Sequence, residues 1–142
     1  MSNIRSFETL ACQFKKSGTI NRLLITGASG RVGSELFNHL KLIYGAENFL
    51  LTDLKNTRNL PEKQFKTLDV RDRKAFDKVI HDFRPDTIIH LANVETLKGE
   101  KDPELALSVN ANGTHNAIEI ATENKLKLFY GSFISAFGAD TP

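Results

Sequence analysis

The sequence is poor in cysteine and contains no tryptophan. Its one cysteine, Cys12, cannot form a disulfide within the chain. No group of Cys and His residues has the spacing of metal ligands. We therefore expect neither an internal disulfide nor a metal site, as is usual for proteins of a reducing compartment.

Long apolar runs and an excess of one charge are also missing. No run approaches the roughly 20 apolar residues of a membrane-spanning helix. The chain has 19 basic and 17 acidic residues, a net charge of +2, without the contiguous basic patch that neutralises a nucleic-acid backbone. Membranes and nucleic acids are therefore not among the expected partners.

The residues that are present have the composition of one ordinary globular domain. The chain has 142 residues, of which 40% are hydrophobic and 25% charged. We divide it into an N-terminal extension, residues 1–20, and one domain, residues 21–142. The extension fits an organelle transit segment and equally a helix that docks on the domain. Both readings rest on apolar residues at helical spacing beside basic ones, namely Ile4, Phe7, Leu10 or Ala11 and Phe14 beside Arg5, Lys15 and Lys16.

From residue 21 onward, short apolar runs alternate with longer segments of helical periodicity. Such alternation is typical of βαβ units and a parallel sheet. Right-handed crossovers then give most simply a doubly wound α/β sheet with the strand order 3-2-1-4-5, a Rossmann fold. The five predicted strands are Arg22–Thr26, Asn48–Thr52 ending at Asp53, Gln64–Leu68, Asp86–Leu91 and Leu126–Tyr130.

Three helices are predicted between these strands. The first follows a glycine-rich turn and ends at Gly45, and the second begins after Asp72 and ends before Pro85. The third begins at Asp102-Pro103, a capping acid followed by proline. Small residues along it would let this helix lie close to the sheet, and they are Ala106, Val109, Gly113, Ala117 and Ala121.

The glycine-rich turn carries the first functional signal. Gly27, Gly30 and Gly33 form a GxxGxxG pattern between a buried strand and an amphipathic helix, the context in which such glycines bind the pyrophosphate of a dinucleotide. Asp53 ends the second strand 20 residues after Gly33, where a carboxylate accepts hydrogen bonds from ribose hydroxyls and repels a 2′-phosphate. Although Lys55 is close by, we predict NAD rather than NADP. The alternative explanation for the three glycines is the packing of a tight turn, and for Asp53 it is an exposed aspartate that binds no ligand.

Further motifs resemble those of the extended short-chain dehydrogenases and epimerases, from Leu23 to the C-terminus. Asp69-Val70 resembles their adenine-contacting pair, His90-Leu91-Ala92 their fourth-strand motif, and Val109-Asn110 with Gly113-Thr114 their helix motif. For His90 a packed role is the alternative to a catalytic one. The glycine loop and this resemblance together imply a set of cofactor-binding residues, namely Gly27, Ser29, Gly30, Arg31, Val32, Gly33, Asp53, Leu54, Asp69, Val70, Leu91, Ala92, Asn93 and Asn110.

Within that superfamily the sequence resembles the L-threonine dehydrogenase family most. Residues 99–106, which lead into Val109-Asn110, carry this likeness together with Ser135-Ala136-Phe137-Gly138 and Thr141-Pro142. The resemblance implies oxidation of the threonine side-chain alcohol with transfer of hydride to NAD. It places Thr96 near a small amino-acid substrate, although a solvated loop threonine fits as well. Animal members are mitochondrial, so mitochondrial and cytoplasmic locations both stay open.

The catalytic residues of the resembled family are not complete in this sequence. That family uses a tyrosine with a lysine four residues later, but the residues four after Tyr44 and Tyr130 are Asn48 and Ile134. We therefore expect a chain truncated before the substrate lobe and inactive on its own. The family's Ser or Thr, five residues before the glycine of the last motif, is Phe133 here. Ser132, one position earlier, is the other candidate for this hydroxyl. Adjacent strand residues point to opposite faces of a sheet, so Ser132 would need a change of register to take that place.

Three functions stay open at this point. They are the NAD-binding part of a threonine dehydrogenase-like oxidoreductase, a non-catalytic NAD-binding regulatory module, and the first half of a nucleotide-sugar epimerase or dehydratase. Because the last strand would form an uncovered sheet edge, we also expect marginal stability or self-association through that edge. A monomer in sedimentation that melts cooperatively in thermal unfolding would contradict this expectation.

Overall fold

The fold is a five-stranded parallel sheet with helices on both faces. The computed structural model describes residues 20–94 and 101–131. The strand order is β3-β2-β1-β4-β5, and every neighbouring pair is parallel. The predicted doubly wound α/β fold is thus confirmed. The strands are β1 (Leu23–Thr26), β2 (Phe49–Asp53), β3 (Phe65–Thr67), β4 (Thr87–His90) and β5 (Lys127–Tyr130).

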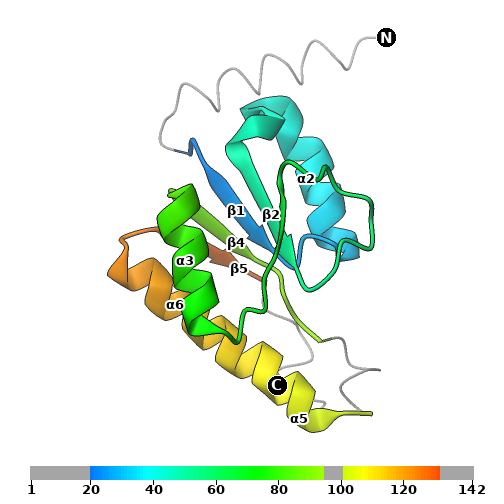
Figure 1. Cartoon of the computed structure of the whole chain (residues 1–142), viewed down its shortest axis with the longest axis vertical. Helices are drawn as coiled ribbons and strands as arrows, with labels where there is room; N and C mark the ends of the chain where they lie inside the picture. The colour runs from blue at the N-terminus through cyan, green and yellow to red at the C-terminus, as the bar shows by residue number, and fades with distance from the viewer. Residues whose placement is uncertain (1–19, 95–100, 132–142) are drawn as a thin grey trace, which may run out of the picture.

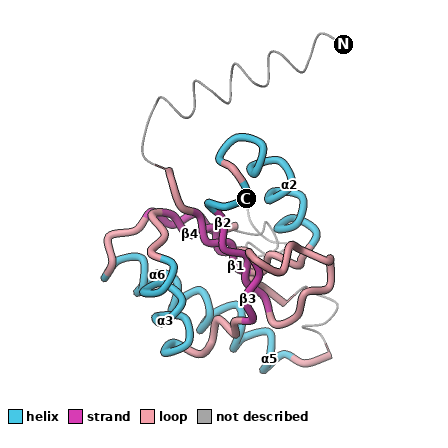
Figure 2. The backbone as a smooth tube through the Cα atoms, turned by 45° about the horizontal axis from the view of Figure 1, so that its top comes forward, coloured by secondary structure: helices cyan, strands magenta, loops and turns pink. Residues whose placement is uncertain are grey.

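Figures 1 and 2 show the helices in two layers. Helix α2 (Arg31–Tyr44), followed by the short η1 (Ala46–Asn48), covers one face of the sheet. Helix α3 (Arg73–Phe83) and helix α6 (Thr114–Glu123) lie side by side on the other face. Helix α5 (Pro103–Leu107) and the π-helical turn η2 (Ser108–Gly113) lead directly into α6.

The hydrophobic core is correspondingly divided by the sheet. Strands β1 and β4 are buried on both faces. For β1 its nearly continuous apolar sequence predicts this burial. Under α3 and α6 the buried side chains are Leu24, Leu68, Val70, Phe76, Val79, Ile80, Ile88, Ala117, Ile120 and Ala121. Under α2 they are Leu23, Ile25, Ala28, Phe37, Phe49, Leu51, Leu60 and Ile89.

The first two predicted helices begin and end at the residues that the sequence indicated. The Asp72 carboxylate accepts a hydrogen bond from the Ala75 amide at the start of α3, and Gly45 ends α2 with a positive φ of 84°. The chain leaves α3 at Arg84, whose φ of 52° already ends the helix before Pro85. The helix thus ends before Pro85 as predicted, and a proline disfavours the helical conformation of the residue that precedes it.

The third predicted helix is not uniform. Its start is confirmed, because the Asp102 carboxylate accepts a hydrogen bond from the Leu105 amide and Pro103 is the first helical residue. The π-helical turn η2 then interrupts the α-helical pattern before α6 begins. Gly113, at the end of η2, lies against Val70: a Cβ atom there would stand 2.6 Å from Val70 Cγ2. Small size at this position thus lets the helix approach the loop after β3.

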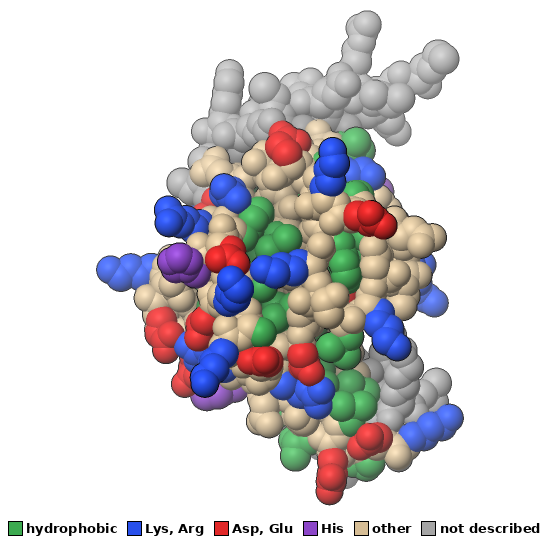
Figure 3. Space-filling view, viewed as in Figure 1, with side chains coloured by type: hydrophobic (Ala, Val, Ile, Leu, Met, Phe, Trp, Pro, Cys, Tyr) green, Lys and Arg blue, Asp and Glu red, His purple; other side chains and the backbone are tan. Residues whose placement is uncertain are grey.

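The molecular surface mixes both charges, as Figure 3 shows for one face. Arg73 joins α3 to α6 through ion pairs with Glu119 and Glu123. Lys66 and Lys78 both pair with Asp82. Among the described residues, no helix is long and apolar enough to cross a membrane.

Strand β5 is one edge of the described sheet. Its Phe129 and Tyr130 side chains are 62% and 52% exposed, which fits the expected edge, whereas self-association through it stays a prediction. The division at residue 20 is likewise untested, because residues 1–19 lie outside the described part of the chain.

Candidate functional site

The carboxyl ends of β1, β2 and β4 meet where the strand order reverses. Gly27 follows β1 there with a φ of 68°, and a Cβ atom on it would stand 2.5 Å from the amide nitrogen of Ala92. The Ala28 amide donates to the Thr52 carbonyl at 3.0 Å. The loop after β1 is thereby held close to β2 and to the chain leaving β4, at the position where ligands bind in doubly wound sheets.

The three glycines of the loop have different surroundings. A Cβ atom on Gly33 would stand 2.5 Å from the Gly27 carbonyl oxygen and 2.8 Å from Ala28 Cα, so this glycine allows α2 to pack against the loop. A Cβ atom on Gly30 would meet only the Gly27 oxygen, at 3.2 Å. Gly30 lines the pocket described below, so its bare backbone leaves room for a bound group.

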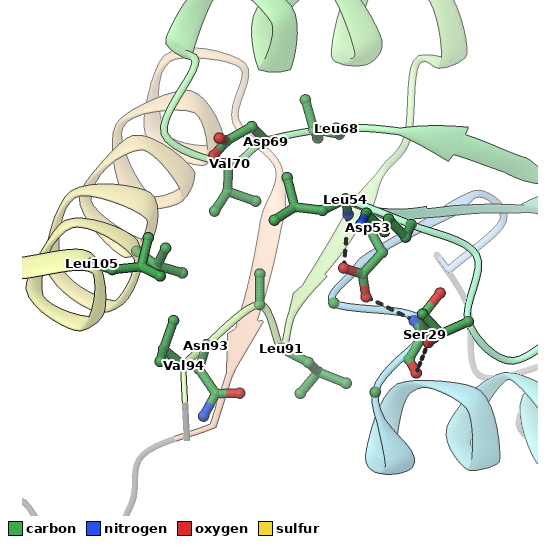
Figure 4. Close-up of a pocket in the computed structure, with 16 residues that line it drawn as sticks. Ser29, Asp53, Leu54, Leu68, Asp69, Val70, Leu91, Asn93, Val94 and Leu105 are labelled. Carbon is green, nitrogen blue, oxygen red and sulfur yellow. Dashed lines mark hydrogen bonds between the residues drawn. The ribbon is translucent and has the colours of Figure 1, made fainter. Parts of the chain in front are cut away.

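Asp53 ties the end of β2 to this loop. Its Oδ2 accepts a hydrogen bond from the Ser29 amide at 2.9 Å, and its Oδ1 accepts one from the Leu54 amide at 2.8 Å (Figure 4). Thr57 Oγ1 donates to the Ser29 carbonyl from the other side at 3.4 Å. The carboxylate is therefore fixed in place and keeps lone pairs for a donor from a ligand.

The Ser29 side chain indicates that this end of the site suits a polar ligand. Ser29 is 6% exposed, and its hydroxyl is a buried side-chain atom of the described chain with no hydrogen-bond partner. An unpaired buried hydroxyl costs free energy, whereas a ribose or phosphate oxygen could satisfy it. The orphaned hydroxyl, the open side of Gly30 and the fixed Asp53 carboxylate together fit a dinucleotide.

These groups line one pocket of about 450 Å³. Figure 4 shows Ser29 and Asp53 at one end and Val70 and Leu105 at the other. The second end is mixed, because Asp69 lies beside Val70 and Asn93 beside Val94 there (Figure 4). Its lining residues are Gly27, Ser29, Gly30, Asp53, Leu54, Lys55, Thr57, Leu68, Asp69, Val70, Leu91, Ala92, Asn93, Val94, Leu105 and Val109.

Most of the predicted cofactor residues line this pocket, and four do not. Arg31 and Val32 lie in the first turn of α2 with exposed side chains, and Gly33 is buried beneath them. Asn110 lies in η2. Six further residues line the pocket although the sequence did not predict them as cofactor-binding: Lys55, Thr57, Leu68, Val94, Leu105 and Val109. Leu105 and Val109 stand four apart on the third predicted helix, a spacing that places them on one face.

Asn110 acts on the pocket wall from outside. Its Oδ1 accepts a hydrogen bond from the Val94 amide at 2.7 Å, and its Nδ2 donates to the Val94 carbonyl at 3.1 Å. The carboxamide thus forms hydrogen bonds with both backbone groups of Val94, in the segment that follows β4. The π-helical turn that carries Asn110 belongs to the wall of the site, a common place for such turns.

His90 is a packed residue and does not line the pocket. It is 4% exposed, with Nδ1 2.8 Å from Thr26 Oγ1 and Nε2 3.3 Å from Thr114 Oγ1. Two hydroxyls, each able to donate or accept, satisfy a neutral ring. Burial lowers the pKa of His90 from 6.5 to about 4, so the ring is neutral at pH 7 and links β1, β4 and α6.

This lowered pKa predicts that acid destabilises the fold. The unfolded chain takes up a proton near pH 6.5, whereas the folded chain does so only near pH 4. Stability therefore falls as the pH drops through that window, by at most about 3 kcal/mol for this one group. Denaturant unfolding between pH 7 and 4 should show a shallower decline for His90→Gln than for the wild type. The exposed His81→Gln control should follow the wild type, and equal slopes for all three chains would contradict this role.

Some predicted residues lie outside the described residues. They are Thr96, Ser132 and Phe133, so their predicted roles stay predictions. Within residues 20–94 and 101–131, no group of three or more His, Cys, Asp or Glu residues is arranged to hold a metal ion.

Comparison with known proteins identifies the family of the chain. Residues 23–142 match the model of the NAD dependent epimerase/dehydratase family. An uncharacterized epimerase/dehydratase of Staphylococcus saprophyticus is 38% identical over 126 residues, which are 87% of this chain and 39% of the relative. A protein of the same description from Staphylococcus haemolyticus is 37% identical over the same length.

Solved structures resemble the chain as well. L-threonine dehydrogenase from Clostridium difficile superposes with a TM-score of 0.82 at 37% identity, over 88% of this chain and 40% of that one. UDP-glucose 4-epimerase from Thermus thermophilus, solved with NAD, gives 0.67 at 30% identity, over 75% and 36%. The chain spans about 40% of the length of its first relatives. Because the family model matches residues 23–142, the chain belongs to the NAD-dependent epimerase/dehydratase family.

Proposed function

We propose that this chain is the NAD-binding part of an oxidoreductase that resembles L-threonine dehydrogenase. The observation that carries the proposal is the Asp53 carboxylate, held by the Ser29 and Leu54 amides beside the open glycine of the loop. In this place the carboxylate would accept hydrogen bonds from the adenosine ribose, and Gly30 would let the backbone approach the pyrophosphate. NAD, when bound, would supply the hydride acceptor.

The same carboxylate favours NAD over NADP. A 2′-phosphate on the adenosine ribose would stand close to Asp53, whose negative charge would repel it. Lys55 also lines the pocket, but two backbone amides hold Asp53 and keep it from turning aside. Discrimination against NADP would thus follow from the fixed position of Asp53.

Among the members of the family, a threonine dehydrogenase is the better supported assignment. The structure of the Clostridium difficile enzyme superposes on more of the chain, and more closely, than that of the Thermus thermophilus epimerase. Threonine dehydrogenases from Phytophthora infestans and Trypanosoma brucei also reach TM-scores of 0.79. We therefore propose a threonine-like amino acid, rather than a nucleotide sugar, as the substrate of the whole protein.

One observation favours a second function, a non-catalytic NAD-binding module. Phe133 stands where the resembled family has a hydroxyl residue. Without a hydroxyl to orient the substrate, binding would occur without turnover. Reduction of NAD by L-threonine in the presence of this chain alone would argue against the second function.

Calorimetric titration with NAD tests the common part of both proposals. Asp53→Ala should weaken NAD binding by about 30-fold, because hydrogen bonds to a charged group contribute about 2 kcal/mol. Asp53→Asn, which keeps an acceptor for the Ser29 amide but loses the charge, should weaken it less. The control Asp82→Ala changes a carboxylate of α3 that lies outside the pocket lining and should bind as the wild type does. Unchanged affinity in Asp53→Ala would refute the cofactor assignment.

A further inference from the structure

The chain that leaves β2 brings two opposite charges to the pocket. Asp53 and Lys55 are two positions apart, and both line it. The lysine side chain is long and flexible, so it could reach the carboxylate and neutralise it. In the part of the chain that the structure describes, however, no ion pair joins the two. Some feature of the fold therefore keeps these charges apart.

The hydrogen bonds of Asp53 do not explain the separation by themselves. Its two oxygens face the Ser29 and Leu54 amides at 2.9 and 2.8 Å (Figure 4). A carboxylate has room for about four donors, so these two bonds leave positions that an ammonium group could fill. The cause must lie in the backbone that carries Lys55.

That backbone turns sharply at Asn56. The Thr57 amide donates to the Lys55 carbonyl at 3.1 Å, which closes a three-residue turn centred on Asn56. Asn56 Oδ1 accepts a hydrogen bond from the Leu60 amide at 2.8 Å, and Asn56 Nδ2 donates to the Leu60 carbonyl at 2.8 Å. One side chain thus closes the loop over residues 56–60 and fixes the direction in which the chain passes Lys55.

Both sides of this loop are anchored to the rest of the fold. The Leu60 side chain is buried and belongs to the core under α2. Thr57 Oγ1 donates to the carbonyl of Ser29 in the glycine loop at 3.4 Å. Because Asn56 bonds to both backbone groups of Leu60, it connects the backbone beside Lys55 to a part of the core that does not move.

We propose that Asn56 is a positioning residue that keeps Lys55 away from Asp53, so that the uncompensated charge of Asp53 faces the ribose and excludes NADP. This inference rests on the proposed NAD-binding function. Once released, Lys55 could pair with Asp53 or approach a 2′-phosphate directly, and both changes would favour NADP. The competing explanation is an asparagine that stabilises its loop and has no influence on the choice of dinucleotide.

Calorimetric titrations with NAD and NADP measure this choice. The wild type should bind NAD about 100-fold more tightly than NADP, because a phosphate would stand beside a carboxylate. In Asn56→Ala the preference should fall to about tenfold. Asn56→Ser, whose hydroxyl can replace only one of the two bonds, should lie between them and also provides a milder variant should Asn56→Ala not fold.

A second substitution at Lys55 identifies the residue that is released. Lys55→Ala alone should keep about the wild-type preference, because the lysine is already held away from Asp53. The double variant Lys55→Ala/Asn56→Ala should return to about 100-fold, since no lysine remains to compensate the carboxylate. Such non-additivity is the signature of two coupled residues. A loop asparagine of purely structural importance would instead weaken the binding of both dinucleotides equally.

Asn124→Ala is the matched control. Asn124 Nδ2 donates to the Ile120 carbonyl at 2.9 Å at the end of α6 and does not line the pocket, so the 100-fold preference should persist. A wild-type preference in both Asn56 variants would overturn the inference, and so would a lowered preference that Lys55→Ala does not restore. A wild type that binds both dinucleotides equally would overturn it while NAD binding stands. A wild type that binds neither would refute the proposed function as well.

Discussion

Gly33→Val is expected to destabilise the fold by about 3 kcal/mol or more. The added Cβ atom would stand 2.5 Å from the Gly27 carbonyl oxygen and 2.8 Å from Ala28 Cα, and both belong to backbone that cannot turn aside. Helix α2 would have to move away from the loop and lose part of its packing on the sheet. Because a domain of this size is stable by only about 5 to 15 kcal/mol, the thermal midpoint should fall by about 10 °C.

The control for this prediction is another glycine of the same chain. A Cβ atom on Gly131 would meet no atom within 4 Å, so Gly131→Ala should unfold within about 2 °C of the wild type. Gly33→Ala, with the first clashing atom but no branches, should lie between the two. A Gly33→Val protein as stable as the wild type in thermal and denaturant unfolding would show that α2 does not require this close approach.

Gly30→Val is expected to have the opposite pattern, with the fold retained and NAD binding reduced about 100-fold. The backbone of Gly30 has φ −69° and ψ 167°, values that any residue adopts. Its Cβ atom would meet only the Gly27 oxygen, at 3.2 Å, so stability should fall by about 1 kcal/mol. The valine side chain would instead project into the pocket, where we place the pyrophosphate.

Melting and calorimetry on the same samples separate the two glycines. Gly30→Val should melt close to the wild type and bind NAD weakly, whereas Gly33→Val should melt early. Gly30→Ala should bind NAD more strongly than Gly30→Val, because a single methyl group fills less of the space. NAD affinity in Gly30→Val equal to that of the wild type would place the dinucleotide elsewhere and contradict the assignment of the pocket.

The strand order and the polar end of the site could be predicted because their signals are local. Strand β1 is a nearly continuous apolar run, which is the pattern expected of a parallel strand buried on both faces. The glycines of the loop and Asp53 were recognisable because the spacing reflects what the backbone must do at that turn. The resemblance to extended short-chain dehydrogenases and epimerases was confirmed by the family match.

Other parts of the site depend on contacts between residues far apart in the sequence. The carboxamide of Asn110 forms hydrogen bonds with the Val94 backbone. The sequence around these two residues does not predict this contact. The motif around His90 did not reveal that Thr26 and Thr114 enclose its ring. Leu105 lies in a helix that the sequence predicted, but only the tertiary structure shows that its side chain lines the pocket.

The residue pattern alone was enough to predict the doubly wound sheet and to single out the glycine loop and Asp53 as candidate site residues. These follow from burial, backbone freedom and charge, which act over a few neighbouring residues. Tertiary packing decided that Gly33 serves the fold while Gly30 faces the pocket, and that Asn110 holds the segment after β4. The reason is physical: the roles of identical glycines and of an exposed asparagine depend on which atoms folding brings within a few ångströms of them.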